Sequence, residues 1–315
     1  MRHRPLGRSG LSTAPLVFGG NVFGWTADEA TSHRLLDAFV DGGFNAVDTA
    51  DVYSAWVPGH EGGESESVIG RWLQASGKRD KVLILTKVAM WPKQPGLSAA
   101  NIAAAVEGSL KRLRTDYIDL YQSHQDDAGT AIDETLEAFD RLVKAGKVRA
   151  VGASNFSVER LRGSLEISKA KGLARYETLQ PKFNLVDREQ VEGAMAELTQ
   201  AEGVGVIPYY GLGAGFLSGK YRAEADFEGK ARGRTILRDY WNDKGRAVLA
   251  ALDDAAAEVG ASQAQIALAW IMAHPVITAP IASATSVAQL DELMAAARLE
   301  LPGEVWRRLD EAGRL

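Results

Sequence analysis

The most constraining feature of this sequence is an alternation, repeated eight times, of short apolar or β-branched runs with longer segments of helical periodicity. The strand-like runs cover residues 16–19, 46–48, 82–86, 118–121, 148–152, 178–181, 204–209 and 276–281. The helical segments cover 28–41, 64–75, 98–113, 131–145, 157–170, 188–201, 244–259 and 286–297. Eight successive strand–helix units predict an α/β fold, the (β/α)8 TIM barrel, formed by residues 1–315 as a single domain.

A barrel of this type uses about 250 residues, so a chain of 315 residues has room for additional segments. We expect an N-terminal hairpin in residues 1–15, where Arg8-Ser9-Gly10 forms the turn. Residues 210–243 form a long loop after the seventh strand, and loops of this length are often functional lids. The other additions are extra C-terminal helices at 262–273 and 302–314.

Composition limits the chemistry and the partners of this chain. It has no cysteine, which excludes a disulfide framework, thiolate zinc sites, iron–sulfur clusters and cysteine nucleophiles. The 36 basic and 41 acidic residues give a net charge of −5 without any block of like charge, so we expect no nucleic-acid partner. No apolar run approaches the roughly 20 residues that span a membrane, and no secretory signal follows the basic N-terminus. We therefore expect a cytoplasmic protein with a small-molecule partner.

Polar residues at the ends of the second, third and fourth strands indicate a proton-transfer site. Catalytic groups of such barrels lie at the C-terminal ends of the strands, where this sequence has Asp48, Tyr53, Lys87 and His124. A tyrosine has an ordinary pKa of about 10, which a nearby ammonium lowers. We expect Lys87 to supply this charge, Asp48 to hold Lys87, and His124 to donate a hydrogen bond to a substrate oxygen. The set suits reduction of a carbonyl, in which Tyr53 protonates the oxygen and a nicotinamide provides the hydride.

These four residues lie in segments that resemble the aldo-keto reductase superfamily, and the resemblance covers essentially the whole chain. The segments are NAVDTADVYSAW, LILTKVAM and YIDLYQSH, followed by VGASNFS, LQPKFN, GLGAGFLSGKY and ATSVAQLDE. The resemblance implies a (β/α)8 barrel that binds NADP(H) across its mouth without a Rossmann fold. It also implies that Tyr53 is the general acid/base, that Lys87 and Asp48 adjust its pKa, and that His124 orients the substrate.

The same resemblance implies a set of cofactor-binding residues. Ser154, Asn155 and Gln180 resemble the residues that bind the carboxamide, whose C=O and NH2 need neutral partners. Tyr209 resembles the aromatic residue that stacks on the nicotinamide ring. The other expected cofactor-binding residues, several of which follow the pyrophosphate along the seventh loop or meet the adenosine end at the eighth helix, are Gly20, Asn21, Asp48, Tyr210, Leu212, Gly213, Gly215, Lys220, Arg232, Ser283, Thr285, Ser286, Gln289 and Glu292.

Departures from the family's pattern bear on the choice of cofactor. Tyr210-Gly211-Leu212 stands where Ser-Pro-Leu is usual, and Ser283 stands where the eighth strand usually ends in Gly. Ser286 occupies a position where a basic residue often pairs with the 2′-phosphate. We still expect NADP(H) rather than NAD(H), because Arg232 or Arg234 in the long loop can supply the missing charge.

Four aromatic residues in the loops above the barrel allow two interpretations. Trp56, Trp91, Tyr240 and Trp241 follow the second, third and seventh strands. They either line a substrate pocket or anchor the loops that carry them. Under the first interpretation, the substrate-binding pocket is partly apolar.

Three other functions compete with an NADP(H)-dependent oxidoreductase that interconverts an aldehyde, ketone or sugar carbonyl with the alcohol. A Schiff-base aldolase would use Lys87 as its nucleophile, which leaves Asp48, Tyr53 and His124 unexplained. A metal-dependent hydrolase needs clustered ligands, whereas the five histidines are scattered along the chain, so we expect no metal. A cofactor-binding regulatory subunit is the main alternative, because some members of the superfamily act as channel partners.

Overall fold

The computed structural model describes residues 1–230 and 232–314. Its ten strands are β1 (Arg4–Pro5), β2 (Ser12–Thr13), β3 (Val17–Gly19), β4 (Ala46–Asp48), β5 (Leu83–Val88), β6 (Ile118–Ser123), β7 (Val148–Ser154), β8 (Tyr176–Gln180), β9 (Gly205–Val206) and β10 (Ile281–Ala282) within this described part. The helices are α1 (Glu29–Asp41), α2 (Glu64–Ser76), α3 (Ala99–Leu113), α4 (Ile132–Lys144), α5 (Val158–Lys171), α6 (Ala194–Glu202), α7 (Gly233–Asp239), α8 (Asp243–Val259), α9 (Gln263–Ala273), α10 (Val287–Ala296) and α11 (Gly303–Ala312).

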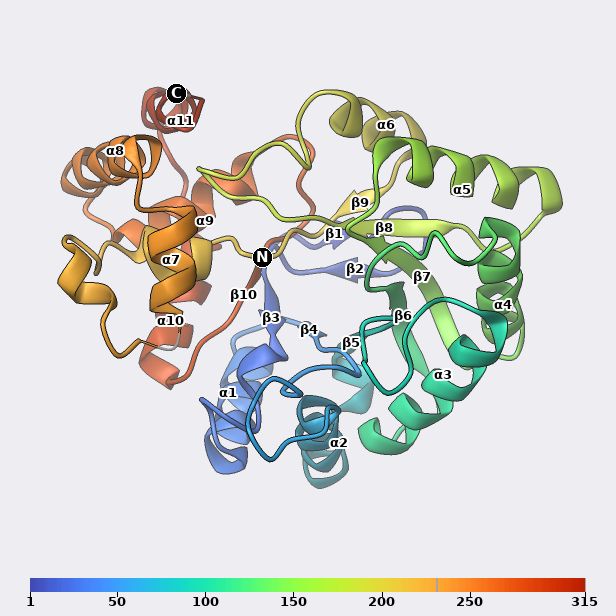
Figure 1. Cartoon of the computed structure of the whole chain (residues 1–315). Coiled ribbons are helices and arrows are strands. Elements are labelled where there is room, and N and C mark those ends of the chain that lie inside the picture. Colours follow the sequence, from blue (N-terminus) through green and yellow to red (C-terminus); the bar gives the residue numbers. More distant parts are fainter. Residues whose placement is uncertain (231, 315) are drawn as a thin grey trace.

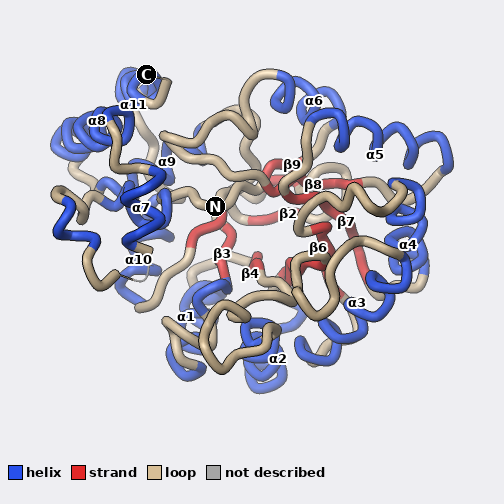
Figure 2. Tube along the Cα trace, viewed as in Figure 1, coloured by secondary structure: helices blue, strands red, loops and turns tan. Residues whose placement is uncertain are grey.

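Eight parallel strands form one curled sheet in the order β10-β3-β4-β5-β6-β7-β8-β9. The ring closes beside its two shortest strands, because the Thr278 N–H donates to the Val206 carbonyl and the Ile281 N–H donates to the Pro208 carbonyl, each at 2.8 Å. The helices surround the strands (Figure 1), and the strands lie together inside this ring of helices (Figure 2). The predicted (β/α)8 barrel is confirmed.

The expected N-terminal hairpin closes one end of the barrel. Strands β1 and β2 pair antiparallel, with Arg4 opposite Thr13. Leu6 and Leu11 are buried, and they belong to the apolar cluster that fills the barrel interior together with residues such as Val17, Leu85 and Leu120. The hairpin therefore covers the N-terminal ends of the strands and leaves the C-terminal edge, called the mouth below, open to function.

Several helices begin where the sequence predicts them, because polar side chains cap their first turn. Asp28, Ser98 and Ser157 each accept a hydrogen bond from a backbone N–H three residues later, which satisfies a donor that the helix leaves free. The extra C-terminal helices are also present as α9 and α11. No described helix is long and apolar enough to cross a lipid bilayer.

Four elements differ from the sequence-based expectation. The seventh strand, expected at 204–209, is confined to β9 (Gly205–Val206). Helix α6 begins at Ala194 rather than at 188, because the chain turns at Gly193 (φ 66°) and the Arg188 guanidinium is buried against Asp310. The eighth strand is confined to β10, since the preceding residues turn and the Ile277 N–H donates to the His274 carbonyl. The loop 210–243 contains two 3₁₀ helices, Gly213–Ser218 and Glu224–Phe227, and helix α7. These elements are too short for sequence periodicity to reveal.

Candidate active site

The four predicted catalytic side chains come from adjacent strands at the mouth. Asp48 is the last residue of β4 and lies opposite Leu85 of β5, so Lys87 lies one pleat farther along β5. His124 follows β6, and its N–H donates to the Val88 carbonyl at 2.8 Å, which continues the hydrogen bonding between β5 and β6. Tyr53 lies in the turn that follows β4. The strands thus bring together residues that are up to 76 positions apart in the sequence.

A closed hydrogen-bond network joins three of these residues. The ammonium of Lys87 donates to Asp48 Oδ2 at 2.6 Å, to the Thr49 carbonyl at 2.8 Å and to the Tyr53 hydroxyl at 3.0 Å. The Tyr53 hydroxyl lies 3.2 Å from Asp48 Oδ2, to which it can donate. Lys87 is completely buried and Asp48 almost so. Each charged group therefore has its partners inside the barrel, which buried charges require.

Two glutamines support Asp48 from the other side. The Gln180 amide donates to Asp48 Oδ1 at 2.9 Å, and the Gln122 amide approaches the same oxygen at 3.5 Å. Gln122 is a residue that the sequence-based prediction missed. Its place in β6, two residues before His124 and therefore on the same face of the strand, is the signal that points to it.

The structure corrects one expectation about Tyr53. Burial raises its pKa well above the usual value, and the adjacent Asp48 carboxylate raises it further. Burial also lowers the pKa of Lys87, which Asp48 opposes. The sequence suggested that Lys87 would lower the Tyr53 pKa, but burial and the Asp48 charge, which also acts on the hydroxyl, have the larger effect. Tyr53 therefore carries its proton at neutral pH.

His124 completes the set from the side of the Tyr53 ring. The two rings meet edge to face with centroids 5.9 Å apart. Burial, followed by the charge of Lys87, lowers the pKa of His124 well below its usual value, so the imidazole is neutral near pH 7. Its Nδ1 is buried and has no hydrogen-bond partner among the described residues. A neutral imidazole can donate one N–H to an uncharged oxygen.

Strained backbone is concentrated at the mouth. Of the described non-glycine residues with positive φ, all but Arg114 lie in loops that follow barrel strands: Ser54, Ala89, Asn155, Tyr210 and Ala214. Such conformations cost of order 1–3 kcal/mol each and tend to occur at functional sites. The mouth is therefore the region where this chain maintains unfavourable backbone geometry.

The residues expected to bind the carboxamide lie together beside Asp48. The Asn155 amide donates to the His124 carbonyl at 3.0 Å and to Ser154 Oγ at 3.1 Å, and its oxygen accepts from the Tyr209 hydroxyl at 2.9 Å. No described residue donates to Gln180 Oε1 in the hydrogen-bond network. The group is neutral, because burial raises the pKa of Tyr209 to about 12.

The loop 210–243 brings further polar groups to the mouth. Gly213, Ala214 and Gly215 have consecutive positive φ angles. A Cβ placed on Gly215 would lie 3.5 Å from Lys220 Nζ. The Lys220 ammonium therefore lies next to backbone that carries no side chain. Arg232 is half-buried. Its positive charge opposes part of the rise in the Tyr53 pKa that burial and Asp48 cause. The loop therefore extends over the mouth toward the proton-transfer residues.

The residues expected at the adenosine end surround the start of α10. Ser286 caps this helix by accepting the Gln289 N–H, and Gln289 Oε1 accepts from Thr285 N and Oγ1 at 2.9 and 3.0 Å. The Ser283 hydroxyl donates to Asn21 Oδ1 at 2.6 Å. The Glu292 carboxylate instead accepts a hydrogen bond from the Ser262 hydroxyl. Ser262 is the residue that caps α9.

The aromatic residues of the loops divide into two groups. Trp56 is 50% exposed and its ring meets both Tyr53 and Trp25 edge to face at 5.9 Å. Trp25, which the sequence-based prediction missed, is fixed by its N–H bond to the Asn21 carbonyl at 2.6 Å. Its only sequence signal is its position in the loop after the first barrel strand.

The other three aromatic residues anchor loops. The Trp91 indole donates to the Glu61 carbonyl at 2.8 Å. Tyr240 is fully buried, stacks on Phe216 and donates to Asp187 at 2.6 Å. Trp241 packs edge to face on Phe216 as well. In these contacts the rings stabilise the loops that carry them, which is the second of the two interpretations.

Comparison with known proteins agrees with this geometry. The family model described as "Aldo/keto reductase family" matches residues 15–314. The chain is 36% identical to uncharacterized oxidoreductase YrpG of Bacillus subtilis, over 99% of this chain and 95% of the relative. It is 34% identical to aldo-keto reductase YhdN of the same organism, over 91% of this chain and 83% of the relative. It is also 32% identical to a probable voltage-gated potassium channel subunit beta of Oryza sativa, over 94% of this chain and 91% of the relative. The chain therefore belongs to the aldo/keto reductase family, whose members are oxidoreductases that use nicotinamide cofactors.

Proposed function

We propose that this chain is a cytoplasmic, single-domain, NADP(H)-dependent oxidoreductase that interconverts a small-molecule carbonyl and its alcohol, with Tyr53 as the general acid/base. The observation that carries the proposal is the buried network in which Lys87 contacts both Asp48 Oδ2 and the Tyr53 hydroxyl. This network holds the hydroxyl at the mouth, beside His124 and the exposed ring of Trp56.

Each residue has a separate task in reduction. The neutral His124 imidazole donates a hydrogen bond that orients the carbonyl oxygen. When bound, the nicotinamide supplies the hydride that reaches the carbonyl carbon. Tyr53 gives its proton to the oxygen as negative charge develops there, and it regains a proton from solvent after the alcohol leaves. Lys87 stabilises the phenolate that forms transiently, because its ammonium lies 3.0 Å from the hydroxyl.

The raised pKa of Tyr53 favours one direction of the reaction near neutral pH. An alkoxide is far more basic than a phenolate, so a protonated tyrosine remains a competent donor even with a pKa above 10. Oxidation of the alcohol needs the phenolate as a base, which is scarce at neutral pH. We therefore propose that the enzyme acts mainly as a reductase under these conditions.

The donor set of the mouth fits a nicotinamide dinucleotide. The free Gln180 Oε1 and the neutral side chains of Ser154 and Asn155 match the carboxamide. Lys220, which lies above the bare backbone of Gly215, matches a diphosphate, and the capped start of α10 provides N–H groups for a phosphate. Arg232 is the cation that favours NADP(H) over NAD(H), since Ser286 supplies no full charge.

The buried position of Lys87 argues against the Schiff-base aldolase. A nucleophilic amine must lose its proton and reach the substrate carbon. The Lys87 ammonium is instead completely buried and contacts three oxygens, those of Asp48, Thr49 and Tyr53. These contacts favour the charged form and leave no path for attack.

A regulatory role is the second candidate, and the likeness to the rice channel-subunit relative favours it. Under this alternative, the chain would bind the cofactor and transmit its redox state to a partner protein without rapid turnover. The complete set of Asp48, Tyr53, Lys87 and His124 argues for turnover in addition to binding.

One assay tests the proposal. The purified protein is screened against aldehydes, ketones and sugars while the absorbance of reduced nicotinamide is followed, with NADPH and NADH in parallel. The proposal expects turnover that Tyr53→Phe removes. Tight NADPH binding without turnover of any carbonyl would favour the regulatory alternative, and turnover that is equally fast in Tyr53→Phe would contradict the assigned role.

A further inference from the structure

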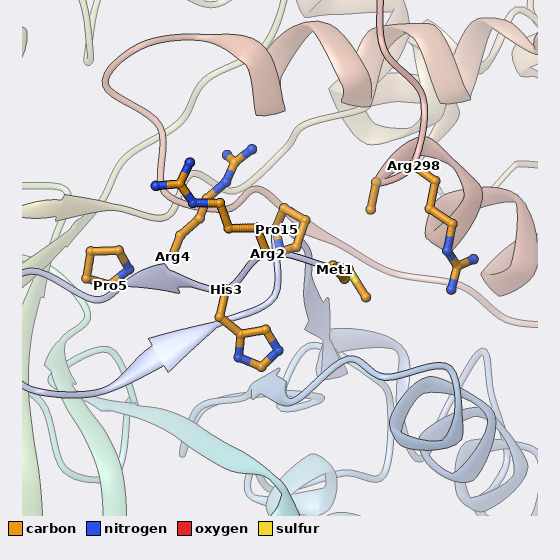
Figure 3. Close-up of a pocket in the computed structure, with 8 residues that line it drawn as sticks. Met1, Arg2, His3, Arg4, Pro5, Pro15 and Arg298 are labelled. Atoms are coloured by element: carbon orange, nitrogen blue, oxygen red, sulfur yellow. The ribbon is translucent and has the colours of Figure 1, made fainter.

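A cavity of about 490 Å³ lies at the end of the barrel opposite the mouth. It is formed where the N-terminal segment passes the residues that precede β3 and the end of α10. Figure 3 shows the side chains of Arg2 and Arg4 extending together on one side of it, with Arg298 on the other side. The residues that line it are Met1, Arg2, His3, Arg4, Pro5, Pro15, Ala297 and Arg298.

The lining of this cavity contains three arginines and a histidine but no acidic residue. Twelve other described arginines form ion pairs with carboxylates. None of Arg2, Arg4 and Arg298 has such a partner within the described residues. The cavity therefore concentrates positive charge that the protein does not neutralise, which favours an anionic ligand.

Arg4 is held in a fixed position at this site. Its Nη1 lies within hydrogen-bond distance of three carbonyls, those of Met272 (2.8 Å), Thr278 (3.2 Å) and Ile277 (3.4 Å). Its Nε and Nη2 donate to no other described residue. Burial lowers the pKa of Arg4, and the neighbouring charge of Arg2 lowers it further. A half-buried Arg4 guanidinium and an exposed Arg2 guanidinium thus lie near each other, an arrangement that an anion between or beside them would stabilise.

The second side of the cavity is also oriented. The Arg298 guanidinium lies 3.3 Å from the Gly42 carbonyl, to which it donates through Nη2. Its remaining N–H groups make no hydrogen bond to the described residues. Arginines on opposite sides of a cavity of this volume can contact different oxygens of one small ligand, as the fork-shaped guanidinium does with phosphate.

We propose that this cavity is a binding site for a small phosphate-bearing molecule with at least two negative charges, held by Arg2, Arg4 and Arg298. The site is separate from the mouth, because the parallel strands place their N-terminal ends here and the ends that carry Asp48 and Lys87 on the other side. The proposal does not depend on the function assigned to the mouth.

Isothermal titration with inorganic pyrophosphate tests this proposal, using the 315-residue chain without an N-terminal tag. The Arg2→Ser/Arg298→Ser double variant is compared with the wild type and with Arg162→Ser, which removes one exposed arginine from α5. Any pyrophosphate that binds at the mouth contributes equally to all three proteins. We expect the double variant to bind at least tenfold more weakly at this site, with Arg162→Ser unchanged.

The proposal is overturned if the wild type and the double variant bind pyrophosphate equally, or if the wild type shows no binding up to about 10 mM. Tighter binding of citrate than of pyrophosphate would contradict the assignment to phosphate. Cosedimentation with phosphatidic acid vesicles that the double variant loses would assign the site to a lipid headgroup and overturn the small-molecule proposal. Circular dichroism of the variants checks that they remain folded.

Discussion

The two halves of the barrel wall are built differently. Strands β5, β6, β7 and β8 are five to seven residues long and pair along most of their length, with one register shift between β7 and β8 at Val151–Gly152. Strands β9 and β10 have two residues each, and the ring there is closed by single backbone bonds. Lys87 and His124 come from the regular half, whereas Lys220, Arg232 and Ser286 come from loops and helix ends of the irregular half.

This difference separates two requirements of one reaction. Proton transfer needs atoms fixed within a few tenths of an ångström, which paired strands and the buried Asp48–Lys87 contact provide. A long dinucleotide must enter and leave, which suits a loop such as 210–243 that lies over the mouth. We therefore expect substitutions in the regular half to change kcat and substitutions in the irregular half to change cofactor affinity.

The largest effect is expected for Tyr53→Phe, in the turn after β4, whose hydroxyl contacts Lys87 of the regular half. The substitution removes the hydroxyl and keeps the ring that contacts Trp56 and His124. Because general acid catalysis contributes about 10²–10⁴-fold, kcat for carbonyl reduction should fall by this factor. The Kd for NADPH, measured by fluorescence quenching, should remain close to that of the wild type. A variant that keeps its kcat but loses cofactor affinity would reverse the division between the two halves.

Lys87→Met should reduce kcat about as much as Tyr53→Phe, on the order of 10²–10⁴-fold. Methionine keeps much of the length of the side chain but removes the ammonium that contacts Asp48 and Tyr53. The losses should not multiply in the double variant, because both residues act on one proton transfer. Steady-state kcat of the two single variants and the double variant provides the test, and fully multiplicative losses would mean that Lys87 acts in a separate step.

Arg232→Ser should lower the affinity for NADPH by about ten- to hundredfold, the value of one charge-assisted hydrogen bond, and change that for NADH little. Arg234→Ser is the matched control, since Arg234 is exposed on the same loop whereas Arg232 is half-buried. The wild type should prefer NADPH, by less than relatives with a basic residue at the position of Ser286. Fluorescence quenching gives the dissociation constants of the wild type and both variants for each cofactor. A wild type that prefers NADH, or equal losses in both variants, would remove Arg232 from the cofactor site.

An effect of another kind is expected, on stability, from a buried carboxyl group in the turn after β4. Asp51 is fully buried, and neither of its oxygens has a partner among the described residues. Burial, with the charge of Glu66, raises its pKa to about 8. The folded state therefore binds a proton that the unfolded state releases above about pH 4, so this group makes the protein less stable as pH rises from about 4 to about 8.

Asp51→Asn should remove this pH dependence. Relative to the variant, the wild type should lose about 1.4 kcal/mol of unfolding free energy per pH unit in this range. Urea unfolding at about pH 5 and about pH 8 measures the difference. Asp291→Asn, at an exposed position of α10, is the control. Its unfolding free energy should change with pH in the same way as that of the wild type. Parallel curves for Asp51→Asn as well would show that Asp51 is not a buried neutral acid.

The sequence predicts the regular half well and the irregular half less well. Asp48, Lys87 and His124 were located because each ends a strand whose apolar pattern is unambiguous. The elements inside 210–243 were missed, since residues 213–218 form a 3₁₀ helix interrupted by Ala214 and Gly215 at positive φ. Helix α6 was predicted to begin too early, because the long-range contact of Arg188 with Asp310 interrupts the pattern.

The electrostatics of the site were also beyond the sequence. The spacing along the strands predicts the contact of Lys87 with Tyr53, but it does not predict the direction in which the Tyr53 pKa shifts. Burial and the Asp48 charge depend on the three-dimensional packing of the mouth, which no sequence spacing reports. Trp25 was missed for a similar reason, because only the fold brings it against Trp56.

The central claim is that a neutral, half-buried Tyr53 moves the proton, and the pH dependence of kcat in both directions tests it most directly. Reduction of a carbonyl should be independent of pH through neutrality, because Tyr53 keeps its proton. Oxidation of the corresponding alcohol should rise with pH throughout the alkaline range that the protein tolerates, since its base forms only above the usual tyrosine pKa of about 10. Tyr53→Phe should lose this rise. An oxidation rate that reaches its plateau near neutral pH, or an alkaline rise that persists in Tyr53→Phe, would contradict the account.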